Sequence, residues 1–159
     1  ETPRRLIDAY EEYLNGYNIA GDQVLKKTFT DVGGYNDIVL LKDISFNSFC
    51  EHHMAPFIGK AHIAYLPSDR VVGISKLARL VDVYAHRLQT QETMTAEITN
   101  AIDQSLKPRG VAVIIDAEHM CMSLRGVKKH NVSTITTRFT GEFDTNENLR
   151  ERFMKLTNN

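Results

Sequence analysis

The chain has 159 residues, of which 42% are hydrophobic and 25% are charged, the length and composition of one ordinary globular domain. Its 19 basic and 20 acidic residues give a net charge of −1, so the sequence lacks the basic excess of a general nucleic-acid binder. A small anion is a better candidate ligand. No apolar run approaches the roughly 20 residues that span a bilayer, which argues against a membrane protein.

The sequence opens at Glu1 with no methionine and no signal-peptide pattern, from which we expect a further N-terminal segment upstream. Its two cysteines, Cys50 and Cys121, do not make a disulfide framework, and each lies within three residues of a histidine. This pattern predicts metal ligation in a reduced compartment, and we expect a cytoplasmic protein.

The first predicted element is a helix over residues 3–14, where apolar residues recur on one face: Leu6, Ile7, Tyr10 and Leu14. Pro3 suits its first turn, and Asn15-Gly16 suits its end. Residues 24–49 are β-branched and alternating around the turn sequence GGYND, which predicts two strands joined by that turn. A further strand is predicted at 57–66.

Two predicted helices follow, each with an apolar stripe: Leu77, Leu80, Val81, Tyr84 and Leu88 in one, and Met94, Ile98, Ala101, Ile102 and Ser105 in the other. Residues 111–126 and 131–143 are rich in β-formers and joined by a basic turn, and the last dozen residues predict a short polar helix. No repeat or linker divides this order of elements. It predicts a single α+β domain over residues 1–159.

Two short motifs predict a metal site. In EHMC, residues 118–121, His119 and Cys121 are two apart on a predicted strand and point to one face, with Met120 and Met122 on the other. If the CEHH motif of residues 50–53 comes close, two thiolates and one imidazole become available, from Cys50, Cys121 and His53. That set suits zinc and leaves a fourth tetrahedral position open, as in catalytic sites.

The remaining histidines, His52 and His119, are candidates for proton transfer beside the metal, because imidazole changes charge near neutral pH. The alternative is a structural zinc, for which His52 or His119 serves as the fourth ligand. A buried cysteine and a hydrogen-bonded histidine are also common without any metal.

A group of basic residues predicts an anion site. Ser75 lies near the start of the first of the two central helices, where free N–H groups, Lys76 and Arg79 suit a phosphate. The plainer interpretation is that both cations solvate an exposed face. Arg125 and Lys128, just after the HMC motif, favour the anion site if a folded sheet brings them to the same ligand.

Gln91 and Glu92 open the second central helix, where a carboxylate is already favoured by the helix dipole. The functional alternative is that Glu92 accepts paired N–H donors from an amino-purine edge. The spacing does not decide between the two.

Read together, five segments resemble the GTP cyclohydrolase I family over nearly the whole chain: ETPRR (1–5), CEHH (50–53), GISKLAR (73–79), RLQTQE (87–92) and HMCMSLRGV (119–127). The resemblance implies the tunnelling fold (T-fold), an antiparallel sheet with paired helices assembled into a toroidal homodecamer whose active sites lie between subunits. It further implies that zinc binds Cys50, His53 and Cys121, and that His52 and His119 transfer protons.

By the same resemblance, Gln91 and Glu92 recognise guanine, Ser75, Lys76, Arg79 and Arg125 hold the triphosphate, and Arg5 acts across an interface. The implied reaction is zinc-dependent hydrolysis and rearrangement of GTP to 7,8-dihydroneopterin triphosphate and formate, the first step of folate or pterin biosynthesis. One position departs from the family pattern, because Asp8 stands where members often carry a lysine facing the triphosphate. Looser binding, replacement by Lys128 or a local rearrangement would each account for it.

Three rival functions remain. A zinc nucleoside deaminase would need H-x-E followed by P-C-x-x-C, which this sequence lacks. A zinc-stabilised nucleotide-binding module would need a closed coordination sphere, and a related tunnelling-fold enzyme would act on another purine or pterin.

Overall fold

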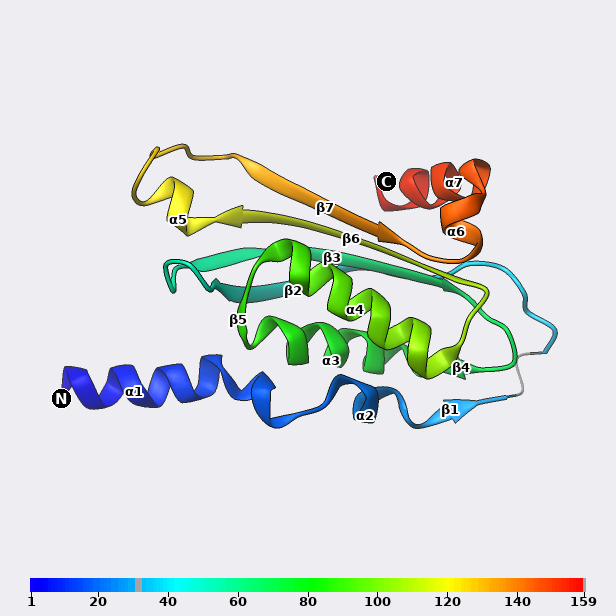
Figure 1. Cartoon of the computed structure of the whole chain (residues 1–159), viewed down its shortest axis with the longest axis horizontal. Coiled ribbons are helices and arrows are strands. Elements are labelled where there is room, and N and C mark those ends of the chain that lie inside the picture. Colours follow the sequence, from blue (N-terminus) through cyan, green and yellow to red (C-terminus); the bar gives the residue numbers. More distant parts are fainter. Residues whose placement is uncertain (31–32, 159) are drawn as a thin grey trace.

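A five-stranded sheet forms the centre of the chain (Figure 1). The structure, a computed structural model, describes residues 1–30 and 33–158. The strand order is β5 (Leu88–Gln89), β2 (Val39–Cys50), β3 (Pro56–Leu66), β6 (Gly110–His119) and β7 (Ser133–Phe139). All neighbours are antiparallel except β5, which runs parallel to β2. The predicted strand at 57–66 is confirmed.

The central helices α3 (Ile74–Ala85) and α4 (Gln91–Leu106) cover one face of the sheet (Figure 1). Both predicted stripes are confirmed as helical, although Leu88 lies beyond the end of α3, in β5. The buried core between helices and sheet includes Leu77, Leu80, Val81, Met94, Ile98, Ile102, Ile63, Tyr65, Val113 and Ile115. This packing makes the sheet and the two helices one body.

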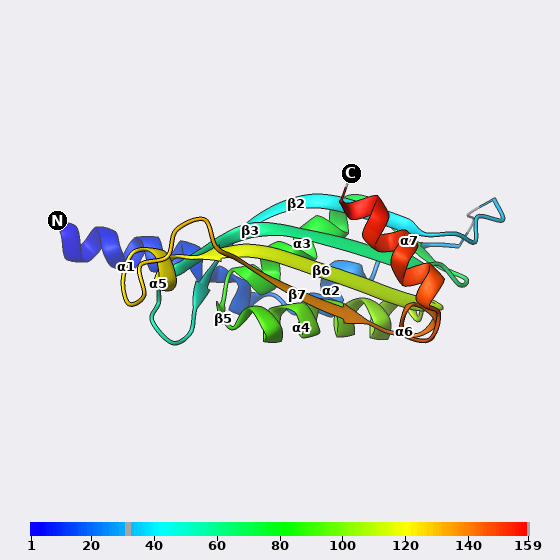
Figure 2. The ribbon, with the colours of Figure 1, turned by 90° about the horizontal axis from the view of Figure 1, so that it is seen from above.

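The opposite face of the sheet is covered at one end by α6 (Glu142–Thr145) and α7 (Glu147–Thr157), which confirms the predicted C-terminal helix (Figure 2). Phe143 and Phe153 pack there against Ala64, Ala112 and Ile114 of the sheet. The rest of this face stays open, since Ile58 is 52% and Ile135 61% exposed. Within the described residues, no helix is both long and apolar enough to cross a membrane.

The N-terminal helix α1 (Thr2–Tyr13) confirms the predicted first helix and extends away from the body of the chain in both views (Figures 1 and 2). Its last turn is attached where Tyr13 stacks on Phe49, with ring centroids 4.8 Å apart. Its apolar stripe is largely uncovered, because Leu6 and Ile7 are 55% and 60% exposed.

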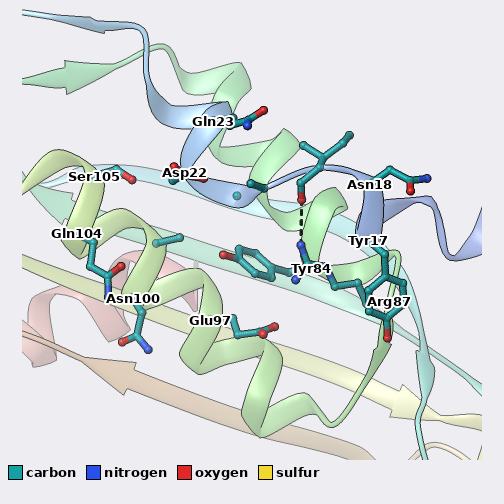
Figure 3. Close-up of a pocket in the computed structure, with 14 residues that line it drawn as sticks. Tyr17, Asn18, Asp22, Gln23, Tyr84, Arg87, Glu97, Asn100, Gln104 and Ser105 are labelled. Carbon is teal, nitrogen blue, oxygen red and sulfur yellow. Dashed lines mark hydrogen bonds between the residues drawn. The ribbon is translucent and has the colours of Figure 1, made fainter.

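The segment after α1 is held to the central helices by Arg87. It comprises the 3-10 helix η1 (Asn15–Asn18) and α2 (Gly21–Leu25). The Arg87 guanidinium donates to the carbonyl oxygens of Gly16 and Ile19 and lies 4.7 Å from the centre of the Tyr84 ring. Figure 3 shows Arg87 and Tyr84 beside each other. Tyr84 and Arg87 line an open cavity of about 700 Å³, which lies between this segment and the helices α3 and α4.

The prediction of two strands over residues 24–49 is wrong in its first half. Val24 lies in α2, and the short strand β1 (Thr28–Phe29) pairs with β4 (Val71–Val72) in a separate two-stranded sheet. The long strand β2 pairs instead with β3. Two apolar runs beside a turn signal are compatible with a hairpin, but β1 finds its partner far along the chain.

The prediction that Cys121 lies on a strand with His119 is also wrong. Strand β6 ends at His119, and Cys121 lies in the one-turn helix α5 (Met120–Ser123). The reason is that β6 has no neighbouring strand to pair with beyond this point. Its pairing with β3 ends at His119, and its pairing with β7 ends at Glu118. Beyond that point the backbone satisfies its hydrogen-bonding groups in a helical turn instead.

Gly59 permits the close approach of β3 and β6. A Cβ at this position would press against the carbonyl oxygen of Asp116 and lie 2.6 Å from Cβ of Ala117. We expect Gly59→Ala to lower the free energy of unfolding by about 1–3 kcal/mol through overpacking, measured by urea denaturation. The control is Gly73→Ala, where the nearest atom is 4.0 Å away, with an expected loss below about 1 kcal/mol. Equal stability of Gly59→Ala and wild type would contradict this account of the sheet.

Candidate metal centre and active site

A cavity of about 230 Å³ lies at the end of the sheet where β2 and β6 finish. Its lining combines the two sequence motifs with the start of α4 and one residue of β7: Cys50, His52, His53, Gln89, Thr90, Gln91, Glu92, His119, Cys121, Met122 and Thr134. Seven of the predicted site residues are therefore brought together, although they come from three separate parts of the sequence.

The loop between β2 and β3 presents Cys50 and His53 to this cavity. It is closed by two backbone hydrogen bonds of 2.8 Å, from Cys50 N to Ala55 O and from Met54 N to Cys50 O. Met54 has φ of +49°, which lets the chain turn back sharply after His53. Glu51 N also donates to Gln89 O, so β5 fixes the side of the same loop.

Among the described residues, Cys50, His53 and Cys121 form one group that could hold a metal ion, with ligand atoms all within 4.8 Å of one another. Two thiols and one imidazole are the soft donor set that zinc prefers, and three protein ligands leave one coordination position open. His52 and His119 line the cavity outside this group. The geometry therefore favours an open site over a closed structural one.

The Cys121 thiol is affected by its burial and by the neighbouring Cys50. Burial raises the pKa of the Cys121 thiol above its usual value of 9.0, and the neighbouring Cys50 raises it further. The charge of Arg125 opposes both effects. Without a metal the Cys121 thiol therefore resists ionisation, and a bound cation would supply the positive charge that two adjacent thiolates need.

His52 lies at the exposed edge of the cavity. Its Nδ1 is 3.7 Å from the Cys50 sulfur, and its Nε2 is 3.8 Å from a carboxylate oxygen of Glu51. The side chain is 64% exposed, so it can meet a ligand without a change in the loop.

His119 is held more firmly. Its ring stacks on Phe57 with centroids 4.7 Å apart and planes within 2°, as expected from the register that pairs these two residues across β3 and β6. Its Nε2 lies 2.7 Å from Oε1 of Gln91. Burial lowers the pKa of His119 from its usual value of 6.5, and the Glu92 carboxylate partly opposes this shift.

The start of α4 places Gln91 and Glu92 differently. Thr90 caps the helix by accepting from Thr93 N, so the next two residues open the first turn beside the cavity. Glu92 is exposed there, whereas Gln91 is 1% exposed and hydrogen-bonded within the protein. A ligand in the cavity can reach the Glu92 carboxylate directly.

The predicted anion-binding residues are not part of this cavity in one chain. Ser75, Lys76 and Arg79 lie in the first half of α3, which begins beside β4 and ends beside β5 (Figure 1). Twelve helical residues span about 18 Å, so Ser75 and Lys76, in the first turn, lie at the opposite end of the helix from β5, which pairs with β2 at Cys50, and Arg79 lies near the middle. Lys76 donates there to the carbonyl oxygen of Val24, 3.2 Å away.

The other predicted cations lie closer to the metal group or on α1. Arg125 follows α5 and is near enough to affect the Cys121 thiol. Arg5 is exposed on α1 beside Glu1, and Asp8 pairs with Arg4 at 3.5 Å. Lys128 is exposed in the turn after α5. Within the chain, Asp8 therefore neutralises a neighbouring cation.

Two features of the site were missed from the sequence. Phe57 looks like an ordinary core residue, and its contact with His119 follows only from the register of β3 and β6. Thr134 and Thr136 of β7 bind the Gln91 amide, a contact between remote parts of the chain for which no local signal exists.

The comparisons with known proteins agree with this geometry. Residues 1–158 match the family model described as GTP cyclohydrolase I. A GTP cyclohydrolase 1 of Sinorhizobium fredii is 59% identical over 156 residues, covering 98% of this chain and 76% of the relative. One of Allorhizobium ampelinum is 58% identical over 159 residues, covering 100% of this chain and 79% of the relative.

Among solved structures, the chain resembles the crystal structure of the archaeosine synthase QueF-Like in the apo form, with a TM-score of 0.56 at 18% identity. The match covers 67% of this chain and 96% of that one. At this identity the likeness concerns the fold, and it confirms the tunnelling fold expected from the sequence.

The proximity of the two thiols has a measurable consequence. Cys50 and Cys121 are free in the structure and within the distance of one metal-ligand group. When the protein is treated with a chelator, to remove any metal, and then exposed to oxygen, we expect a disulfide between them. Mass spectrometry of the non-reduced protein should show one linked peptide pair and the loss of two hydrogens. Two free thiols after prolonged oxidation would contradict the proximity.

Proposed function

The chain belongs to the GTP cyclohydrolase I family, and from this membership we propose that it converts GTP into 7,8-dihydroneopterin triphosphate and formate with zinc as its cofactor. The observation that carries the proposal is the three-ligand group of Cys50, His53 and Cys121, which opens onto a cavity that also holds His119 and Glu92. A metal ligand set, a proton-transfer group and a carboxylate for the base are thus available to one substrate.

The donor set fits zinc, with Cys50 and Cys121 as thiolates and His53 as neutral imidazole. A zinc ion in such a set is a Lewis acid that makes water a better nucleophile near neutral pH. Guanine C8 is a poor electrophile until N7 is protonated, and His119 is our candidate for that proton transfer. Ring opening followed by a second hydrolysis would release C8 as formate.

The chain's own residues account for the later steps as well. His52, exposed at the cavity edge, is the proposed acid for opening the ribose before rearrangement and closure of the dihydropterin ring. The Glu92 carboxylate would accept the paired N–H donors of guanine, and a substrate fixed at its base and at its triphosphate stays in place through several reactions.

The triphosphate contacts require a second subunit in this proposal. Ser75, Lys76 and Arg79 lie in the first half of α3, and none of them lines the cavity of the metal-binding group in the same chain. We therefore propose that a neighbouring copy supplies them to each cavity, with Arg125 from the chain that holds the metal. Arg5, on the projecting helix α1, would come from a further interface.

The exposed apolar surfaces support assembly into the proposed homodecamer. Helix α1 projects with Leu6 and Ile7 uncovered, β7 is an edge strand, and Ile58 and Ile135 leave part of the sheet open. Apolar surfaces and strand edges of this kind are usually covered by another chain. Thiolate ligands also fit the reducing cytoplasm, where we place the enzyme.

The rival functions make different demands on the same residues. A zinc-stabilised binding module needs a fourth protein ligand, whereas the group found among the described residues has three. A related purine or pterin as substrate would leave the cations of α3 without a triphosphate to bind.

The test is incubation of the zinc-loaded protein with GTP, followed by formate quantification and pterin fluorescence after oxidation. We expect both products. Cys121→Ala should lose zinc and formate release together, whereas His119→Ala should keep zinc and lose about 10²–10⁴-fold in kcat. His130→Ala, at an exposed histidine outside the cavity, is the control and should keep both. Bound zinc without formate or pterin from wild type would overturn the proposal.

The oligomer is tested at α1. Leu6→Glu with Ile7→Glu places two charges on the exposed apolar stripe, and we expect the decamer to fall to smaller species because those charges would be buried at an interface. Size-exclusion chromatography with light scattering measures the mass. Glu12→Lys, an exposed position of α1 outside that stripe, serves as a control that should remain decameric. A double variant with the wild-type mass would show that α1 lies outside the interfaces.

A further inference from the structure

Gln91 is a buried polar residue whose side chain connects α4 to the sheet. Its Nε2 lies 3.0 Å from Ile115 O, 2.8 Å from Thr134 O and 3.1 Å from the hydroxyl oxygen of Thr136. Its Oε1 faces Nε2 of His119 at 2.7 Å. A side chain that is 1% exposed and contacts two strands is fixed in one orientation.

These contacts identify which end of the Gln91 amide is which. Backbone carbonyl oxygens accept hydrogen bonds and cannot donate, so the amide atom facing Ile115 O and Thr134 O must be the NH2 nitrogen. The amide oxygen is therefore the atom that faces His119. An amide oxygen accepts and never donates, so His119 Nε2 must carry a hydrogen.

We propose that Gln91 is a positioning residue that holds His119 as its Nε2–H tautomer and leaves Nδ1 as the nitrogen that exchanges protons with substrate. The Phe57 ring fixes the plane of the imidazole, and Gln91 fixes its rotation within that plane. Because the Gln91 oxygen accepts from Nε2–H in both charge states of the ring, a proton can enter or leave His119 at Nδ1 alone.

This role replaces a direct guanine contact for Gln91. The two hydrogens of its amide nitrogen already face three acceptors, and the oxygen is engaged by His119. If Gln91 bound guanine, some of its buried hydrogen bonds would have to break. The new contact with guanine would at best recover the free energy lost in breaking them. Base recognition then belongs to Glu92, which is exposed beside the cavity.

The inference deepens the proposed function and rests on it for the identity of the substrate. In the step it describes, the proton on Nδ1 of the imidazolium moves to a ring nitrogen of the base, and His119 becomes neutral with its hydrogen retained on Nε2. Gln91 touches no reacting atom. Its effect is to present the same nitrogen to the substrate in every catalytic cycle.

The first experiment measures the tautomer directly in the wild-type, zinc-loaded protein. Solid-state NMR of protein labelled with nitrogen-15 in histidine separates protonated from unprotonated ring nitrogens, and the spectrum of His119→Ala identifies the His119 signals. At a pH where His119 is neutral we expect a protonated Nε2 and an unprotonated Nδ1. A hydrogen on Nδ1 would overturn the inference whether or not the protein turns over GTP.

The second experiment separates positioning from substrate recognition. Gln91→Met keeps the length of the side chain and removes its polar atoms, so both tautomers of His119 become available. We expect kcat for formate release to fall about 100-fold or more while KM and the GTP affinity measured by calorimetry stay within about threefold. A large rise in KM with unchanged kcat would instead assign Gln91 to guanine and overturn the inference.

Thr99→Val is the matched control for lost polar bonding in α4. Thr99 is fully buried and donates to Thr95 O at 2.7 Å, so this variant also loses a buried hydrogen bond. It touches neither Gln91 nor His119, and kcat should remain within about twofold of wild type. If wild type releases no formate, the proposed function fails, whereas full activity in Gln91→Met with active wild type defeats the inference alone.

Discussion

The pairing of β3 with β2 on one side and β6 on the other is the constraint on which the site depends. The register aligns Phe49 with Pro56 and Phe57 with His119, so both neighbours of β3 finish at the same end of the sheet. Cys50 and His119 are thereby brought together although they lie far apart in the sequence. A shift of one residue in either pairing would turn these side chains to the other face of the sheet. The close contact at Gly59 helps to keep β3 and β6 in this register.

The start of α4 is tied to the same end of the sheet by polar contacts inside the apolar core. Gln91 and Thr95 bind groups on β6 and β7, and Thr95 reaches Thr136 at 2.7 Å. Buried polar groups are tolerable when every one of them has a partner, and such a network fixes one arrangement where apolar packing alone would accept several. These contacts fix the start of α4 beside His119, and they thereby fix the position of Glu92 in the cavity lining.

The sequence was most informative where chemistry is local. CEHH and HMC carry, at short spacing, the residues of the group that could hold a metal ion, and the helical stripes of α3 and α4 carry their own periodicity, so these features could be predicted. The predictions that were wrong concern which strands pair with each other and where that pairing ends. A two-residue strand such as β1 has too little pattern to indicate that it pairs with β4, and Cys121 leaves the strand because β6 runs out of neighbours. The contacts of Gln91 with β7 depend on tertiary packing and have no counterpart in local sequence.

In the proposed function the residues that bind one substrate lie toward the two ends of α3, so activity would depend on assembly. The length of α3 sets the distance between the backbone of Lys76 at its start and the cavity near its end. In the proposed function, one chain would therefore supply its metal and base residues to one active site and the anion-binding residues of α3 to another. A ring of identical chains would complete every site without any new element, since each chain would add its anion-binding residues to the metal and base residues of its neighbour. Helix α1 and the edge strand β7 are uncovered in the single chain, and they would provide surfaces for those contacts.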